Sequence, residues 1–325
     1  MVILEATKPS NKPVTVVTVS KRRRSRPSLL RNKWLYLMLL PGVLHLLVFK
    51  IAPVGAISIA FQNFSPFQGI FGSEWVGLDQ FVRIVNDPQI PQLIANTLIL
   101  AIGTLVFSFP APIIFALFLN EIRARFLRKF VQTLSFMPYF ISSAVLVSIL
   151  YTLLSPQGGL VNEIIQRFGG EPISFMTEPG WFRPLYISMI VWQTFGYGTI
   201  IYLAAITAID PILYEAADVD GAGRFKKMWH VTLPSIAPMM VVMLIVAIGQ
   251  VLTVDIDKIL LMYNPNTYAT ADVLQTYVYR VAFASTGFPD YSYAAAVSLL
   301  QGVVAFILVV TTNKISKKVS GSGLF

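Results

Sequence analysis

The chain has 325 residues, of which 55% are hydrophobic and 13% are charged, and its net charge is +9. Soluble domains carry about 25% charged residues, so this composition indicates a polytopic membrane protein. The sequence contains no cysteine, which excludes disulfides and thiolate metal sites. Its two histidines, His45 and His230, are too few for a histidine-rich metal site.

The first segment, residues 1–33, is polar and basic and includes KRRRSR at 21–26. It is long for the basic region of a signal peptide, and no clear A-x-A cleavage site follows it. We therefore expect a disordered cytoplasmic arm, after which the first apolar run stays in the protein as an anchor.

Six apolar runs follow, each long enough to cross the hydrocarbon of a bilayer, which takes about 20 apolar residues in a helix. They cover roughly 34–60, 91–119, 131–154, 184–209, 236–262 and 291–313. The predicted fold class is therefore all-α, a polytopic membrane protein with about six transmembrane helices in residues 34–313. A cytoplasmic tail is expected over residues 314–325.

The positions of Lys and Arg predict the orientation, because cytoplasmic loops carry an excess of them. Four regions hold 19 of the 25: the arm, RARFLRK, GRFKK and the tail. Both termini and the loop over residues 210–235 are therefore expected in the cytoplasm. Because the basic bias follows this topology, it does not favour nucleic-acid binding.

The loop over residues 210–235 carries the signals of two short helices separated by glycine. Asp210 and Pro211 are typical of a helix start, and Gly221 is typical of a helix end. A second short helix should then end at Leu233-Pro234, with Pro238 opening the fifth span.

Two acidic residues of this loop break the local rules for helices. Asp218 and Asp220 lie at the negative end of the first short helix, where an acid costs about 0.3–1 kcal/mol. Small residues around them leave the backbone open to close approach by another surface. An ordinary amphipathic loop on the membrane surface is the alternative interpretation.

The order of residues in this loop resembles the EAA loop of binding-protein-dependent ABC importers. The matching residues are Glu215, Ala216, Ala217, Asp220, Gly221, Ala222, Phe225, Trp229, Val231, Leu233 and Pro234. WVGLDQF at 75–81 and IIYLAAITAID at 200–210 are similar to the membrane subunits of the carbohydrate-uptake branch. LLMYNPNTYATADVLQTYVYR at 260–280 and GSGLF at 321–325 resemble its polysaccharide and oligosaccharide permeases, of the alginate-importer type.

The resemblance implies a type I ABC importer-like fold and a coupling role for the loop. Glu215 would pair with a basic group of a separate ATPase, and Ala216, Ala217 and Ala222 would allow close docking. Gly221 would form the bend, which Leu233 and Pro234 would link to the fifth span. The misplaced acids would then have their partner on another chain.

The resemblance also implies the partners and the location. These are an ATPase dimer that binds ATP and Mg, a second homologous permease in an expected heterodimer, an external solute-binding protein and a saccharide that crosses by alternating access. The location would be the bacterial cytoplasmic (inner) membrane. The sequence has no GxxxxGK[ST] phosphate loop and no plausible Ser-His-Asp set, so we expect no catalytic site, metal or cofactor in this chain.

Polar residues within the apolar runs are candidates for a substrate path, because polar groups at membrane depth are usually functional. The candidates are Trp192, Gln193, Tyr197, Gln250, Asp255 and Asp257. An aromatic ring beside the Gln193 amide suits a sugar, and hydrogen bonding between helices is the alternative. In a continuous fifth helix, Asp255 and Asp257 would lie about 28–32 Å from its start, near the outer interface. There they would be solvated, or would contact substrate or the binding protein.

Two other classes of protein stay open at this point. An ion-coupled secondary transporter would use Asp255 and Asp257 as coupling carboxylates, but no inverted repeat is detectable and the EAA-like loop would be unexplained. A membrane anchor or assembly subunit would leave the polar groups of the spans without a role.

Overall fold

The computed structural model describes residues 33–284 and 287–320 and divides the chain into two units, residues 1–55 and 56–325. The expected basic arm therefore lies almost wholly outside the described residues, as does GSGLF at 321–325. In the first unit, α1 (Lys33–Leu46) continues into a π-helical turn, Leu47–Ile51, and a 3₁₀ segment, Ala52–Phe61, begins there. The wider π turn lies just before Pro53, whose ring would clash with the carbonyl four residues earlier in a regular α-helix.

The second unit is helical apart from one short hairpin, so the all-α prediction is confirmed in substance. Strands β1 and β2 pair antiparallel, with Gln62 opposite Trp75. The elements are β1 (Gln62–Asn63), α2 (Gly69–Gly72), β2 (Glu74–Trp75), α3 (Asp79–Asn86), α4 (Ile90–Ser108), α5 (Pro110–Glu121), α6 (Arg125–Phe136), α7 (Ser143–Leu154), α8 (Leu160–Arg167), α9 (Pro179–Thr207), α10 (Pro211–Val219), α11 (Arg224–Lys227), α12 (Leu233–Gln250), α13 (Ile256–Met262), α14 (Tyr268–Ala271), α15 (Leu274–Phe283) and α16 (Tyr291–Ser320).

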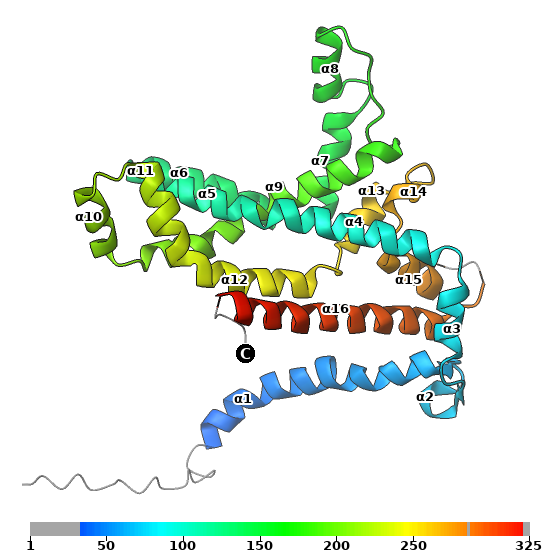
Figure 1. The fold of residues 1–325 in the computed structure, drawn as a ribbon. Coiled ribbons are helices and arrows are strands. Elements are labelled where there is room, and N and C mark those ends of the chain that lie inside the picture. The colour runs from blue at the N-terminus through cyan, green and yellow to red at the C-terminus, as the bar shows by residue number, and fades with distance from the viewer. Residues whose placement is uncertain (1–32, 285–286, 321–325) are drawn as a thin grey trace, which may run out of the picture. The chain divides into compact units, whose positions relative to one another are not determined.

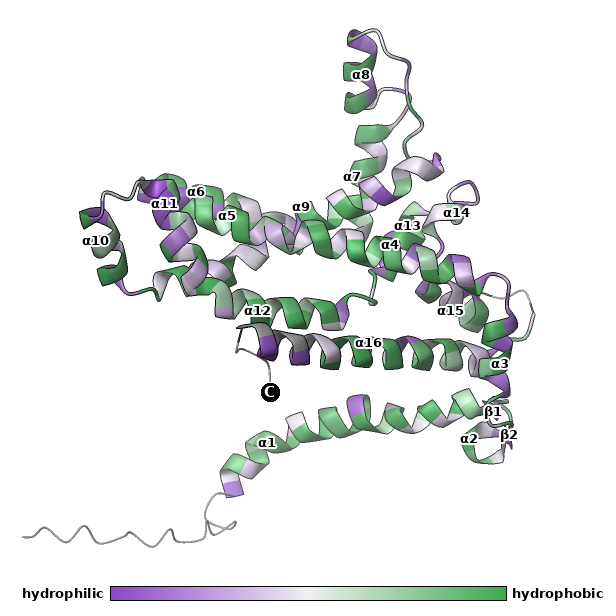
Figure 2. Cartoon of the chain, in the orientation of Figure 1, coloured by the Kyte–Doolittle hydropathy of each residue, from purple (hydrophilic) through white to green (hydrophobic). Residues whose placement is uncertain are grey.

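Among the described residues, five helical stretches are long and apolar enough to cross a membrane, or six if one bent pair counts as a span. The five stretches are Lys33–Phe61, Ile90–Glu121, Pro179–Thr207, Arg224–Gln250 and Tyr291–Lys314. Apolar residues follow the long helices of the second unit, and hydrophilic residues gather around α11 and at the end of α16 (Figure 2). Helix α16 continues through the first part of the tail expected from residue 314, as far as Ser320.

The third apolar run, expected as one helix over 131–154, is bent instead. Arg125–Phe140 and Ser143–Leu154 meet at an angle of 102°. Pro138 lies in a 3₁₀ turn, Met137–Phe140, where it has no N–H to continue the helical ladder. Ser142 then starts α7, since its side chain accepts a hydrogen bond from the N–H of Val145.

The fifth run differs from the prediction at both ends. The expected helix over 236–262 ends at Gln250, and α13 is a separate helix capped by Asp255. At the other end, helical structure continues from Arg224 through a π turn, Met228–Thr232, into α12. Pro234 therefore does not end a short helix, because the π turn removes the clash between its ring and the carbonyl of His230.

Helix α9 is the centre of the second unit. It packs against α4, α5, α6 and α12, and α12 in turn packs against α16 (Figure 1). At Gly196, α9 approaches the end of α6 so closely that a Cβ atom would lie 1.9 Å from the carbonyl oxygen of Ser135. Buried apolar side chains on either side of this crossing include Leu100, Tyr186 and Ile259 in one cluster, and Ile113, Tyr202 and Ile236 in another.

A carboxylate at the end of α3 joins this helix to α15 and α16. Asp87 accepts hydrogen bonds from the hydroxyls of Tyr277 at 2.6 Å and Tyr293 at 2.8 Å. Burial by itself raises the pKa of Asp87, but the bonds from these tyrosines and from the N–H of Gln89, with the charge of Arg83, outweigh it. The pKa of Asp87 therefore lies below its usual 3.8.

Candidate functional site

A polar cavity of about 390 Å³ lies between α4, α9 and the segment that joins α12 to α13. Its polar lining comes from Thr104, Ser108, Tyr186, Gln193, Thr194, Gln250, Thr253, Asp255 and Lys258. The volume is within the range of about 300–1,000 Å³ for small-molecule sites. Hydroxyls, amides and charges in one cavity allow hydrogen bonds to a ligand that carries many hydroxyl groups.

An ion pair between Asp255 and Lys258 forms part of the cavity wall. The ammonium of Lys258 donates to Oδ2 of Asp255, and the Lys258 side chain is only 6% exposed, against 35% for Asp255. Asp255 Oδ1 also accepts from the backbone N–H of Lys258 at 3.4 Å, which caps α13. The backbone N–H of Asp255 donates to the Tyr186 hydroxyl at 3.0 Å, so α9 holds the start of α13 in place.

Gln193, Gln250 and Asp255, three of the candidates for a substrate path, line this cavity together. Gln193 is buried, and its Nε2 donates to the carbonyl of Ile141 at 2.9 Å, just before α7. That bond joins α9 to the start of α7. Gln193 therefore also fits the alternative interpretation, a hydrogen bond between helices.

The other three candidates lie elsewhere. Trp192 lines a separate, mainly apolar groove, because successive residues of a helix face different directions. Tyr197 stacks on Tyr139 with ring centroids 4.0 Å apart and planes 8° apart. Asp257 is exposed and is not among the residues of the polar cavity. Trp192 and Gln193 therefore line different cavities.

Sequence reasoning missed six of the nine polar residues that line the cavity: Thr104, Ser108, Tyr186, Thr194, Thr253 and Lys258. Tyr186 and Lys258 were not singled out, and neither was Thr104, whose hydroxyl oxygen is buried with no hydrogen-bond partner in the described part of the chain. The i, i+3 spacing of Asp255 and Lys258 was a usable signal for their ion pair. Nothing in the sequence connects Thr104 on α4 with either of the others.

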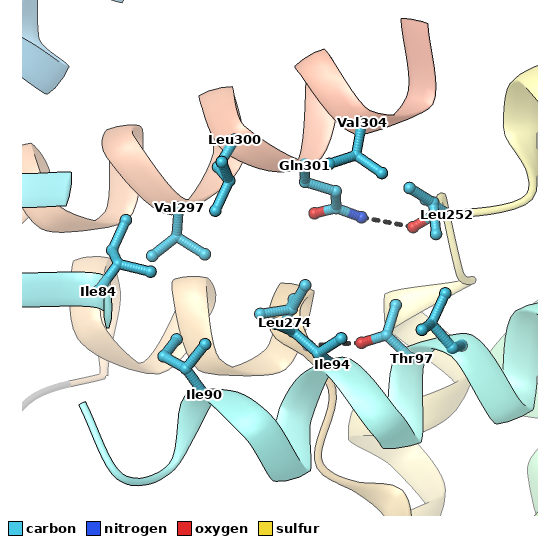
Figure 3. Close-up of a pocket in the computed structure, with 11 residues that line it drawn as sticks. Ile84, Ile90, Ile94, Thr97, Leu252, Leu274, Val297, Leu300, Gln301 and Val304 are labelled. Carbon is cyan, nitrogen blue, oxygen red and sulfur yellow. Dashed lines mark hydrogen bonds between the residues drawn. The ribbon is translucent and has the colours of Figure 1, made fainter. Parts of the chain in front are cut away.

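A second cavity, of about 130 Å³, contrasts with the first because its lining is almost wholly apolar. It lies among α3, α4, α15 and α16, with Ile84, Val297 and Leu300 among its walls (Figure 3). The amide of Gln301 donates to the carbonyl of Leu252, so this polar group is already paired (Figure 3). Such a cavity has no free hydrogen-bonding groups for a sugar, and it is small.

The loop between α9 and α12 has the local structure that its sequence predicts as far as Gly223. Asp210 accepts from the N–H of Ile212 at 2.9 Å and Pro211 is the first residue of α10. Gly221 has φ of 72°, and its N–H bonds the carbonyl of Asp218 at 3.0 Å. The N–H of Ala222 bonds the carbonyl of Ala217 at 2.9 Å, which completes a Schellman motif.

The acidic residues of this loop differ in whether they have an ion-pair partner in the described chain. Asp218 forms an ion pair with Lys227 at 2.7 Å, so the expectation that its partner lies on another chain is wrong. The short return after Gly221 brings α11 back to the end of α10 and makes this pair possible. Neither Glu215 nor Asp220 has an ion-pair partner within residues 33–284 and 287–320.

Large apolar side chains of the loop are also exposed. Val219 is 89% exposed, Phe225 76% and Trp229 67%. Exposed apolar side chains grouped with charges are typical of a surface that binds another protein or a membrane. The Tyr214 hydroxyl and Oγ1 of Thr232 lie 2.9 Å apart, which joins α10 to the π turn before α12.

The fold and these two regions define a class: a multi-pass helical membrane protein with a polar cavity between its helices and a polar loop that suits a partner. Residues 108–319 match the family described as the inner membrane component of binding-protein-dependent transport systems. The chain belongs to this family and is a permease subunit of an ABC transporter, which makes it a transport component and not an enzyme.

Individual relatives cover almost the whole chain. It is 46% identical to the polygalacturonan/rhamnogalacturonan transport system permease protein YteP of Bacillus subtilis (strain 168), over 94% of each protein. It is 30% identical to the arabinooligosaccharides transport system permease protein AraP of the same organism, over 88% of each. Its structure is similar to a chain in the crystal structure of a bacterial alginate ABC transporter in complex with an alginate pentasaccharide-bound periplasmic protein. The TM-score is 0.83 and the identity 38%, over 91% of this chain and 98% of the other.

Proposed function

We propose that this permease imports a saccharide, of oligosaccharide or polysaccharide type, that an external binding protein delivers. The observation that carries the proposal is the 46% identity, over 94% of both chains, to a permease named for polygalacturonan and rhamnogalacturonan. The polar cavity supports it, because Gln193 and Gln250 are among the polar side chains that line a space between membrane helices.

The ion-coupled alternative fits the described residues less well. Asp255 is paired with Lys258 and caps α13, and Asp257 is exposed. A coupling carboxylate must exchange its ion or proton during the cycle, whereas both oxygens of Asp255 have structural bonds.

The loop over residues 210–235 is, in our proposal, the contact with a separate ATPase subunit, which would bind ATP and Mg. Glu215 is exposed without an ion-pair partner in the described chain, so it is free for a basic group of the ATPase. Ala216, Ala217, Asp220, Gly221 and Ala222 would form the docking face of the helix and its bend.

The connection to the membrane helices is more direct than the sequence suggested. Phe225, Trp229, Leu233 and Pro234 belong to one helical stretch that runs from Arg224 to Gln250. A movement of the loop would therefore be passed along this stretch to Gln250, which lines the polar cavity. This geometry supports alternating access driven by the ATPase.

The assembly we propose contains an ATPase dimer, a second permease in a heterodimer and an external solute-binding protein, in the bacterial cytoplasmic membrane. Both termini and the 210–235 loop would face the cytoplasm. Such an assembly, reconstituted in proteoliposomes, should import oligosaccharide only with ATP inside and should keep doing so with a proton ionophore. Import that needs the proton gradient and no ATP would refute the proposal.

The coupling role is tested by reversing one charge. Glu215→Lys should abolish uptake and substrate-stimulated ATP hydrolysis while the protein stays in the membrane. Asp218→Asn is the matched control on the same helix, because it breaks only an exposed ion pair worth about 0–1 kcal/mol. Normal uptake by Glu215→Lys would contradict the role of this residue.

A further inference from the structure

The ammonium of Lys258 has unused hydrogen-bonding capacity. Its side chain is 6% exposed, and it lies in the wall of the polar cavity. An ammonium has three N–H donors, and the described contacts use one of them, on Asp255. A buried cation that cannot reach bulk water favours further acceptors, and a carboxylate is the strongest of these.

Asp255 orients this cation and leaves two of its three N–H donors for a ligand. Its two oxygens bond the backbone and the side chain of Lys258, so the lysine is held in one position. Asp255 is also more exposed than Lys258, at 35% against 6%. Water can therefore stabilise Asp255 when a second carboxylate shares the ammonium.

The rest of the lining suits the neutral part of such a ligand. Thr104, Gln193, Thr194 and Gln250 carry no charge and match hydroxyl groups.

From this geometry we propose that Lys258 selects acidic sugars by binding the carboxylate of a uronate residue, and that Asp255 is its positioning residue. The proposal rests on the proposed function as a saccharide importer and names the substrate class of the same cavity. Asp255 weakens the hold of Lys258 on the uronate, because it competes for the same cation. This competition keeps binding weak enough for the sugar to leave.

The test compares galacturonate trisaccharide with its methyl ester, which has the same skeleton without the negative charges. Uptake of each is measured in proteoliposomes that contain the full complex and the same binding protein throughout. The preference of the binding protein then cancels when a variant is compared with the wild type. The variants are Lys258→Gln, Lys258→Arg and Asp255→Asn, and Asp257→Asn is the exposed control on the same helix.

We expect Lys258→Gln to lower kcat/KM for the acid about tenfold or more, the effect of one charge-assisted hydrogen bond, and to change the ester little. Lys258→Arg should keep the preference for the acid. Asp255→Asn should change the acid in the opposite direction to Lys258→Gln, with a lower KM, because the amide oxygen still accepts from the ammonium while the competing negative charge is gone. Asp257→Asn should leave both substrates unchanged.

Two results would overturn the assignment and leave the importer intact. One is an equal loss for acid and ester in Lys258→Gln, and the other is the same direction of change in Asp255→Asn as in Lys258→Gln. Either would mean that the pair only holds α13 in place. A wild-type complex that imports the ester or another neutral oligosaccharide with ATP but not the acid would also overturn the assignment alone. A wild-type complex that imports no oligosaccharide with ATP would instead refute the proposed function, and the assignment with it.

Discussion

Replacement of Gly196 by alanine tests the closest helix contact described above. A Cβ at this position would lie 1.9 Å from the carbonyl oxygen of Ser135 and 2.8 Å from the backbone nitrogen of Phe136. Both neighbours are backbone atoms, so no side chain can rotate away to make room. Helices α6 and α9 must separate by about 1 Å or more, in an interior that yields little.

The size of the effect follows from what the separation would break. Overpacking of this kind costs about 1–3 kcal/mol. The hydrogen bond from Gln193 to Ile141 contributes about 0.5–1.5 kcal/mol, and the stacked rings of Tyr139 and Tyr197 contribute a similar amount. Alanine offsets about 1 kcal/mol of this loss, because it is a better helix former than glycine. We therefore expect a net loss of about 1–5 kcal/mol in the free energy of unfolding.

Gly180→Ala is the matched control, because it lies on the same helix and its Cβ would meet no atom within 4 Å. Thermal unfolding of the purified complex in detergent should show a lower midpoint for Gly196→Ala and no loss for Gly180→Ala. Uptake should fall with the first variant, since Gln193 lines the polar cavity. Equal midpoints for the two variants would refute the reasoning about the crossing.

The remaining predictions concern the loop and the end of α3. Gly221→Ala places a side chain at φ of 72°, so we expect about 1 kcal/mol of local strain and weaker stimulation of the ATPase. Gly223→Ala is the control, because this residue has φ of −67° and the variant should behave as wild type. Asp87 has a folded-state pKa below 3.8, so the stability it contributes is full above about pH 4 and is lost as the pH falls through the lowered pKa. Asp87→Asn should therefore flatten the acid side of a plot of unfolding free energy against pH, and Tyr277→Phe should flatten it less.

Two outcomes would contradict these predictions. Equal ATPase stimulation in the Gly221 and Gly223 variants would show that the bend does not need a left-handed residue. If Asp87→Asn leaves the decrease of unfolding free energy at low pH unchanged, other carboxylates determine the loss of stability below about pH 4.

Local patterns predicted the parts of this protein that depend on neighbours in sequence. The apolar runs marked the membrane helices, because a helix satisfies its own backbone groups and needs only apolar side chains around it. Asp210 and Gly221 marked the ends of α10 for the same reason, since a cap acts within one turn. The EAA-like spacing identified the family, which the match over residues 108–319 confirms.

Local patterns gave wrong helix boundaries in two places. In one the helix continues past a proline, and in the other it ends inside an apolar run. Pro234 looked like a helix end, but the π turn before it lets the helix continue to Gln250. The apolar residues after Gln250 predicted a continuation of the fifth membrane helix, but Asp255 caps a separate helix there. A hydropathy pattern is the same in both cases, because it does not record the direction of the backbone.

The sequence by itself determined that this is a polytopic helical permease with a charged, bent loop between two of its spans, because hydropathy, caps and spacing are properties of consecutive residues. Only the tertiary structure decided which polar residues meet. Thr104, Tyr186 and Lys258 come from three separate helices, and they line one cavity because α4, α9 and α13 pack together. The reason is that side-chain contacts between helices depend on how closely the backbones approach and on which faces meet, which no single helix specifies.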